Sequence, residues 1–160
     1  MKIIICPGSA QNQKFKRWPV KKFVELARLS ELHGMIVLII LGPEEQDLVN
    51  FFLQFNTIQS ATFDELKSLS DDVDLVICND SFLLHFFSII NKKVLALYGP
   101  TDPNRTLPPN AYMLTSKLPS SSRPCWGSKL YGKCDNGRCS CFDKLEANDV
   151  FNKALSILSI

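Results

Sequence analysis

Residues 74–102 read DLVICNDSFLLHFFSIINKKVLALYGPTD and contain two short apolar runs separated by a helical stretch. The runs are 74–78 (DLVIC) and 93–98 (KVLALY), and neither alternates apolar with polar side chains. Strands of this kind are buried on both faces, which is typical of a parallel sheet covered by helices. The stretch 80–90 between them has the length of a crossover helix, so the segment predicts a β-α-β unit.

The same alternation continues on both sides of this segment. Apolar runs at 2–6 and 35–41 predict two more strands, and a weaker one lies at 57–59. After residue 99 the periodicity is lost until a closing helix. The expected helices cover 19–34, 42 to about 55, a stretch that starts at Thr62 with Glu65 completing a capping box, and 146–158. We therefore predict an α/β fold, a doubly wound parallel sheet that is Rossmann-like.

Length, charge and apolar content limit the classes of function that the chain can have. The 160 residues are enough for one domain, and a formal net charge of +2 without any basic run gives no support for nucleic acid as a partner. The longest apolar stretch, 35–41, is too short to span a membrane. The apolar run at 2–6 is also too short for the core of a signal peptide. These features predict a cytoplasmic protein.

Polar loops follow several of the predicted strands, at 7–17, 42–45, 79–85 and 99–106. Carboxyl ends of parallel strands meet at one edge of a sheet, where ligands bind in doubly wound folds. The first loop, residues 7–17, carries three cations ahead of a helix, and free helix N-terminal amides favour phosphate. We interpret the loops as a cationic cradle for a pyrophosphate. The alternative for the first loop alone is a solvated basic turn. Trp18 is expected to pack in the core.

The other loops also allow two interpretations each. Asp80 and Ser81 stand at a helix N-terminus, where capping their own backbone is the simpler role. His85 lies among apolar residues and could be a satisfied core histidine. Thr101 and Asp102 bring polar groups to the edge of the sheet, although Asp-Pro turns are also common structural punctuation.

Taken together, these segments resemble glycosyltransferase family 9, the ADP-heptose:lipopolysaccharide heptosyltransferase family. The likeness begins at PGSA (7–10) and KRWP (16–19), continues through LGPEE (41–45), and is strongest across 74–106. It implies that residues 1–160 form the nucleotide-sugar-binding, C-terminal-type lobe of a two-lobed GT-B glycosyltransferase. The missing N-terminal lobe would hold the acceptor and the catalytic base, so no catalytic residue is assigned in this chain.

The resemblance also implies roles for individual residues in donor binding. Ser9 and Lys16 would contact the diphosphate, and Glu44 or Glu45 would reach the ribose. The phosphate and sugar side would be lined by Asp80, Ser81 and His85, with Thr101 and Asp102 closing the crevice. Family members are inverting and need no metal, so no cofactor is expected. Phe82 and Leu83 depart from the family, which usually has Gly and Pro there. The Phe82 ring could narrow the donor's approach or point into the sheet.

The implied function is donor binding for inverting transfer to a lipopolysaccharide core or related acceptor, with ADP-heptose as the expected donor. The implied partners are the nucleotide-sugar and an acceptor at the inner membrane surface; nucleic acid is not among them. The chain could be a fragment of a longer protein, or it could work with a separate chain that carries the acceptor lobe. The alternative is a non-catalytic nucleotide-binding or metal-stapled remnant without an acceptor lobe. Phe82 and Leu83 favour that alternative.

Six cysteines divide into two groups. Cys6 and Cys78 sit in apolar runs and are expected to be inert core residues. The others lie in a Cys-rich loop at about 119–142 with the spacing C-x8-C-x4-C-x-C, and they are Cys125, Cys134, Cys139 and Cys141. Four thiolates could hold zinc or iron, but without a CxxC pair the alternative of reduced structural cysteines is favoured. No metal site is predicted.

Overall fold

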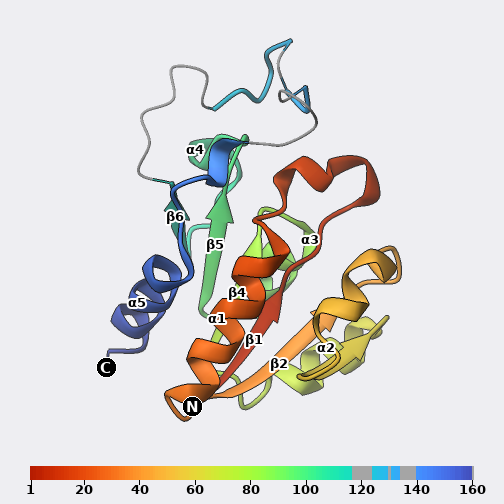
Figure 1. The fold of residues 1–160 in the computed structure, drawn as a ribbon, viewed down its shortest axis with the longest axis vertical. Coiled ribbons are helices and arrows are strands. Elements are labelled where there is room, and N and C mark those ends of the chain that lie inside the picture. Colours follow the sequence, from red (N-terminus) through yellow and green to blue (C-terminus); the bar gives the residue numbers. More distant parts are fainter. Residues whose placement is uncertain (117–123, 130, 134–139, 160) are drawn as a thin grey trace.

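The computed structural model describes residues 1–116, 124–129, 131–133 and 140–159. In these ranges six strands form one parallel sheet in the order β3-β2-β1-β4-β5-β6 (Figure 1). The strands are β1 (Lys2–Cys6), β2 (Ile36–Leu41), β3 (Asn56–Gln59), β4 (Leu75–Asn79), β5 (Val94–Tyr98) and β6 (Ala111–Thr115). The chain starts at β1, winds outward to β3, and returns to β4 on the other side of β1. The predicted doubly wound α/β fold is therefore confirmed, with its switch point between β1 and β4.

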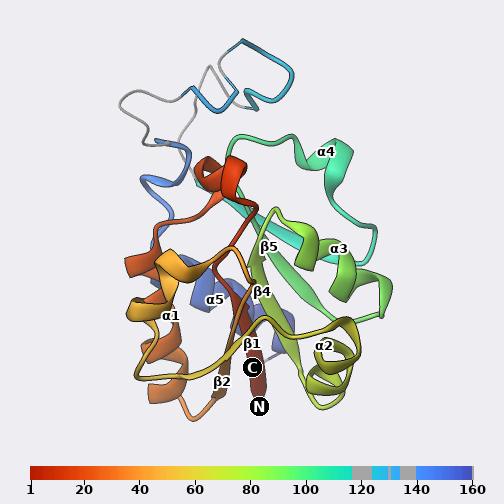
Figure 2. The same ribbon diagram turned by 90° about the vertical axis from the view of Figure 1, so that its right-hand side faces the viewer.

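Helices cover both faces of the sheet (Figure 2). α1 (Val20–Leu32) and α5 (Ala147–Leu158) lie over one face, and α2 (Phe63–Ser70) and α3 (Phe82–Ile89) lie over the other. Successive side chains of β1 enter different cores: Ile3 and Ile5 pack under α1 and α5, while Ile4 and Cys6 pack under α2 and α3. Burial on both faces explains why the central strands β1, β2, β4 and β5 are apolar at nearly every position.

Two expectations about the elements are wrong. The segment 42–55 forms no α-helix but a short 3-10 helix, η2 (Gln46–Phe51), because Asp47, Val49 and Asn50 are weak helix formers. The stretch after residue 99 was expected to lack regular structure, yet it contains the one-turn helix α4 (Pro103–Thr106) and strand β6. β6 lies at the edge of the sheet, and its middle residues, Tyr112 and Met113, are exposed. Its apolar run, AYML at 111–114, is short and stands apart from the alternating strands and helices that precede it.

The remaining helices agree with the sequence. Thr62 and Glu65 form the predicted capping box of α2: Glu65 N–H donates to Thr62 Oγ1 over 3.3 Å, and Thr62 N–H donates to Glu65 Oε2 over 2.7 Å. Two further 3-10 helices are η1 (Gln11–Lys16) and η4 (Ser140–Phe142). Within the described ranges, no helix combines the length and apolar character that crossing a membrane requires.

The cysteines are only partly described. Cys6 and Cys78 are fully buried neighbours on β1 and β4, as predicted, and burial raises the pKa of both thiols. Both therefore stay protonated and unreactive at neutral pH. Cys125 and Cys141 are also buried, while Cys134 and Cys139 lie outside the described residues. The described part of the chain contains no cluster of three side chains suited to a metal ion.

Candidate functional site

The first loop is fastened to the sheet by Asn79, a residue that the sequence did not single out. Asn79 ends β4 and is completely buried. Its Nδ2 donates to the carbonyl oxygens of Pro7 and Gly8 over 2.8 Å and 3.1 Å, and its Oδ1 accepts from the backbone N–H of Trp18 over 2.9 Å. One amide side chain thus holds both ends of the loop. Trp18 itself is buried, as expected, and its indole donates to the Leu145 carbonyl.

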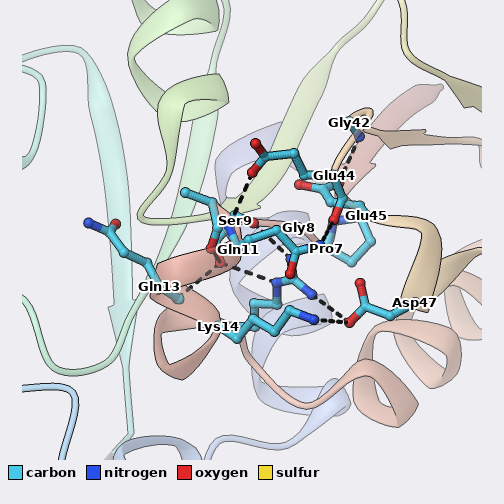
Figure 3. Close-up of polar contacts among 12 residues, drawn as sticks. Pro7, Gly8, Ser9, Gln11, Gln13, Lys14, Gly42, Glu44, Glu45 and Asp47 are labelled. Carbon is cyan, nitrogen blue, oxygen red and sulfur yellow. Dashed lines mark hydrogen bonds and ion pairs between the residues drawn. The ribbon is translucent and has the colours of Figure 1, made fainter.

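Inside the loop, hydrogen bonds from an arginine side chain hold Ser9 in place (Figure 3). Arg17 donates from Nε to Ser9 Oγ over 3.2 Å and from a terminal nitrogen to the Ser9 carbonyl over 2.8 Å. The Ser9 hydroxyl donates to the Gln13 carbonyl. Asp47 accepts hydrogen bonds from both Arg17 and Lys14 over 3.0 Å. Partial burial raises the pKa of Asp47, but these two cations outweigh it, so the pKa is lowered. Ser9 is therefore presented by a rigid turn.

Glu45 packs its carboxyl group against the backbone of Gly8. The carboxyl accepts the Gly42 N–H over 2.8 Å, and a Cβ atom added to Gly8 would lie only 1.7 Å from it. Residue 8 must therefore be glycine for Glu45 to occupy this place. Burial raises the pKa of Glu45, although the Gly42 N–H and the nearby Arg17 oppose the shift. Its neighbour Glu44 is exposed and accepts from the backbone N–H of Gln11 (Figure 3).

We expect Glu45→Gln to raise the midpoint of thermal unfolding at about pH 8 and to leave it nearly unchanged at about pH 4. A raised pKa in the fold means that this group's contribution to stability is complete below the ordinary glutamic acid pKa and is lost as pH rises through the raised value. Glutamine keeps an acceptor for the Gly42 N–H without burying a charge. Calorimetry across this pH range, with exposed Glu44→Gln as control, provides the test. A midpoint difference that does not vary with pH would contradict it.

A buried ion pair lies next to this loop. Lys16 Nζ is 3.0 Å from Asp80 Oδ2, and the two side chains are only 12% and 6% exposed. Ser81 is the N-cap residue of α3 but makes no side-chain capping hydrogen bond within the described residues. Ser81 therefore does not show the simple capping role. The Leu84 N–H donates to the Ser81 carbonyl over 3.2 Å, so the N–H groups of Phe82 and Leu83 are the first-turn donors that α3 offers to an anion.

A cavity of about 200 Å³ opens at the carboxyl ends of β1 and β2 and the start of α3. Its polar lining includes Ser9, Glu45 and Ser81, and its apolar lining includes Phe63, Phe82 and Leu83. Typical small-molecule pockets measure roughly 300–1,000 Å³, so this one can hold only part of a larger ligand. The Phe82 ring lines the cavity and does not point into the sheet.

The nine predicted residues are thus distributed unevenly. Ser9, Glu45 and Ser81 share the cavity. Asp80, the partner of Lys16, directly precedes Ser81 in the chain, whereas Glu44 lies on the surface of its turn. His85 is exposed and lines a different hollow beside Arg105, which shares no residue with the cavity. Past β5, Thr101 is buried, with no hydrogen-bond partner for its hydroxyl among the described residues, and Asp102 caps α4 by accepting the Asn104 N–H.

The Cys-rich segment contacts the same edge of the sheet. The carbonyl of Pro100, just past β5, accepts the backbone N–H groups of Cys125 and Trp126 over 3.0 Å and 3.1 Å. Further along the segment, the ring of Tyr131 packs edge-on against Phe15 of the first loop, with 5.0 Å between the ring centroids. The described part of the segment therefore joins the exit of β5 to the first loop.

The predicted cationic cradle is less positive than the sequence indicates. Lys14 and Arg17 both face Asp47, and Lys16 faces Asp80. Each of these three cations thus stands against a carboxylate that the sequence pattern alone does not pair with it. A phosphate group at this edge would have to compete with those carboxylates.

Comparison with known proteins identifies relatives over most of the chain. The model of glycosyltransferase family 9 (heptosyltransferase) matches residues 1–130. Lipooligosaccharide heptosyltransferase 2 of Haemophilus influenzae is 32% identical over 119 residues, which cover 64% of this chain and 32% of that protein. Lipopolysaccharide heptosyltransferase 2 of Escherichia coli is 31% identical over 113 residues, with the same shares. The chain thus spans about a third of the length of these two curated relatives.

Solved structures show the same fold. The ADP-heptose lipopolysaccharide heptosyltransferase II of Escherichia coli superposes with a TM-score of 0.77 at 20% identity, over 99% of this chain and 46% of that one. A family 9 glycosyltransferase from Veillonella parvula gives 0.77 at 22% identity, with the same coverage. Escherichia coli heptosyltransferase WaaC with ADP gives 0.72 at 16% identity, over 98% and 44% of the two chains. The chain therefore has the fold of somewhat under half of each of these solved structures.

Proposed function

Because the chain belongs to glycosyltransferase family 9, the heptosyltransferase family, we propose that it is the donor-binding lobe of a glycosyltransferase. The donor is a nucleotide-diphosphate sugar of the ADP-heptose type, and the acceptor is a lipopolysaccharide core or related glycan at the inner membrane surface. The names of the relatives support this choice of donor and acceptor. The acceptor lobe comes from further residues of a longer chain or from a separate chain.

One observation carries the proposal: a cavity with the buried Glu45 carboxylate reaches Ser81, the residue that follows Asp80 of the buried Lys16–Asp80 pair, at the carboxyl edge of the sheet. The cavity has room for a nucleoside but not for a whole nucleotide-sugar. Within it, Glu45 is the proposed acceptor for ribose hydroxyl groups, since Glu44 lies outside. The diphosphate then extends from the cavity past Ser9 toward Lys16 and the first turn of α3.

The chemistry requires positive groups where the diphosphate leaves. Glycosyl transfer breaks the bond between the sugar's anomeric carbon and the phosphate oxygen, and the electron pair stays on the departing diphosphate. The Lys16 ammonium and the α3 amides stabilise that charge electrostatically without a metal ion. The diphosphate replaces Asp80 as the partner of Lys16, and Asp80 becomes free to accept hydrogen bonds from sugar hydroxyls. The acceptor hydroxyl and its base belong to the other lobe.

His85, Thr101 and Asp102 stay predictions for the sugar side of the crevice. They do not line the cavity, so they contact the donor only if its sugar extends along the edge toward β5. The Cys-rich segment borders that part of the edge through Pro100.

Isothermal titration of the chain with ADP, AMP and pyrophosphate in the presence of EDTA tests the proposal. ADP should bind, and AMP should bind about 10- to 150-fold more weakly, because it lacks the phosphate that makes a charge-assisted hydrogen bond with Lys16. A folded chain that binds none of the three would overturn the proposal. ADP binding without heptosyl transfer after an acceptor lobe is supplied would support the alternative of a non-catalytic nucleotide-binding module, which Phe82 at the cavity favours.

A further inference from the structure

Three phenylalanines, Phe63, Phe82 and Phe86, form an aromatic cluster between α2 and α3. The ring centroids of Phe63 lie 5.6 Å from Phe82 and 5.7 Å from Phe86, and those of Phe82 and Phe86 are 6.1 Å apart. Phe86 also meets the fully buried ring of Phe87 edge-on at 5.2 Å, which anchors the cluster to the core. The cluster is therefore a fixed surface and not a set of independent side chains.

Two of its rings remain open to solvent at the cavity. Phe63 is 63% exposed and Phe82 is 58% exposed, and both line the cavity that contains Glu45. Large apolar rings that stay exposed together beside a cavity with polar lining indicate a binding site. The cavity lining thus combines two aromatic rings with a carboxylate. A ligand that matches both has a flat apolar ring joined to a group with hydroxyls, which is the composition of a nucleoside.

We propose that Phe63 and Phe82 form the platform on which the nucleobase stacks, and that this platform makes the site selective for a purine. The inference rests on the proposed function, since it assumes that a nucleoside diphosphate occupies the cavity. Stacking on an aromatic ring is available to every base, but the larger purine covers more of the two rings than a pyrimidine. A glycine at position 82, as in the resembling family pattern, would provide no ring for such contact.

The test compares leucine variants of both rings with a matched control. F63L, F82L and the double variant remove aromatic rings from the cavity and keep apolar side chains, so the fold should be retained. F51L makes the same exchange at a phenylalanine that is 40% exposed on η2 but does not line the cavity. F82Y retains the ring. Each chain is titrated with ADP, UDP and pyrophosphate, and its thermal unfolding is measured.

We expect each single variant to bind ADP about tenfold more weakly than the unmodified chain, within the range for loss of one stacking ring. The preference for ADP over UDP should fall in the double variant, pyrophosphate affinity should not change, and F51L and F82Y should bind as the unmodified chain does. An unchanged ADP-to-UDP ratio in the double variant would overturn the inference. So would a parallel loss of pyrophosphate affinity, which would indicate that the rings only support the fold.

The failure of the proposed function has a different signature. If the unmodified chain binds neither ADP nor pyrophosphate, the function and the inference both fail. If it binds both and the double variant keeps the full preference for ADP, only the inference about the aromatic platform fails.

Discussion

Replacing Lys16 by methionine is expected to lower the free energy of unfolding by about 3 kcal/mol. The Asp80 side chain is 6% exposed, and the Lys16 ammonium lies 3.0 Å from its carboxylate. Without Lys16, the buried Asp80 charge would lose this partner. Methionine preserves the apolar stem of the side chain, so the loss reports on the charge. Urea denaturation at neutral pH provides the measurement.

Two further variants show whether the loss comes from the buried pair. K16M/D80N removes both charges and should recover most of the lost stability, because replacing a buried pair by neutral groups is often close to neutral. K14M breaks the pair with Asp47, whose partners are 46% and 42% exposed, and should cost at most about 1 kcal/mol. If K16M and K14M lowered the free energy of unfolding equally, the buried Asp80 charge would not depend on Lys16 for its stabilisation.

The K16M/D80N variant also separates stability from binding. It should fold yet bind pyrophosphate about 10- to 150-fold more weakly than the unmodified chain, since the charge-assisted contact of Lys16 is gone. D80N alone removes the competing carboxylate and is the reference for Lys16. If the folded double variant bound pyrophosphate as tightly as D80N does, Lys16 would not belong to the proposed donor site.

Asn79→Ala should also destabilise the chain by about 3 kcal/mol. The substitution leaves the carbonyls of Pro7 and Gly8 and the N–H of Trp18 without their partner in the interior, and each unsatisfied buried group costs roughly 1–3 kcal/mol. The first loop should also lose its fixed position, so pyrophosphate binding should weaken together with stability. Urea denaturation and titration of the same protein measure both effects.

Asn110→Ala is the matched control. Asn110 is exposed and donates one hydrogen bond, to the Ser88 carbonyl over 2.9 Å, so its loss should cost about 1 kcal/mol or less. If Asn79→Ala cost no more than this control, the loop would not depend on the amide for its position.

Most of the fold could be predicted because its central strands are buried on both faces. Runs such as 35–41 and 93–98 are apolar at nearly every position, and that signature is visible without any tertiary information. The edge strand β6 has only a short apolar run, AYML at 111–114, which follows the turn LPPN and is not preceded by a helix of ordinary length, so it does not stand out as part of the alternating pattern. The turn at η2 was mistaken for an α-helix because its apolar spacing is helical while its residue types disfavour a long helix.

The site could be predicted only as a set of loops. Parallel strands bring their carboxyl ends to one edge, and this alone located the first loop and the turns after β2 and β4. The individual contacts depend on partners far away in the sequence. Asn79 acts on residues 61 to 72 positions away, and Asp47 pairs with Lys14 and Arg17 from 33 and 30 positions away.

Neighbouring residues with similar chemistry were equally hard to separate. Glu44 and Glu45 are equivalent candidates in the sequence, and only the folded chain distinguishes them: Glu45 is buried against Gly8 and lines the cavity, whereas Glu44 is exposed. The contact between Phe63 and Phe82 joins two helices, so no local pattern indicates it.

The pairing of cations with carboxylates at the first loop also determines how an anionic ligand arrives. Beyond a Debye length of about 10 Å in 0.1 M salt, the fields of Lys14, Arg17 and Lys16 are largely offset by those of Asp47 and Asp80. The edge therefore exerts little long-range attraction, and the rate of capture should change only slightly with ionic strength. The donor is then recognised only after it has collided with the site, when its diphosphate replaces Asp80 as the partner of Lys16.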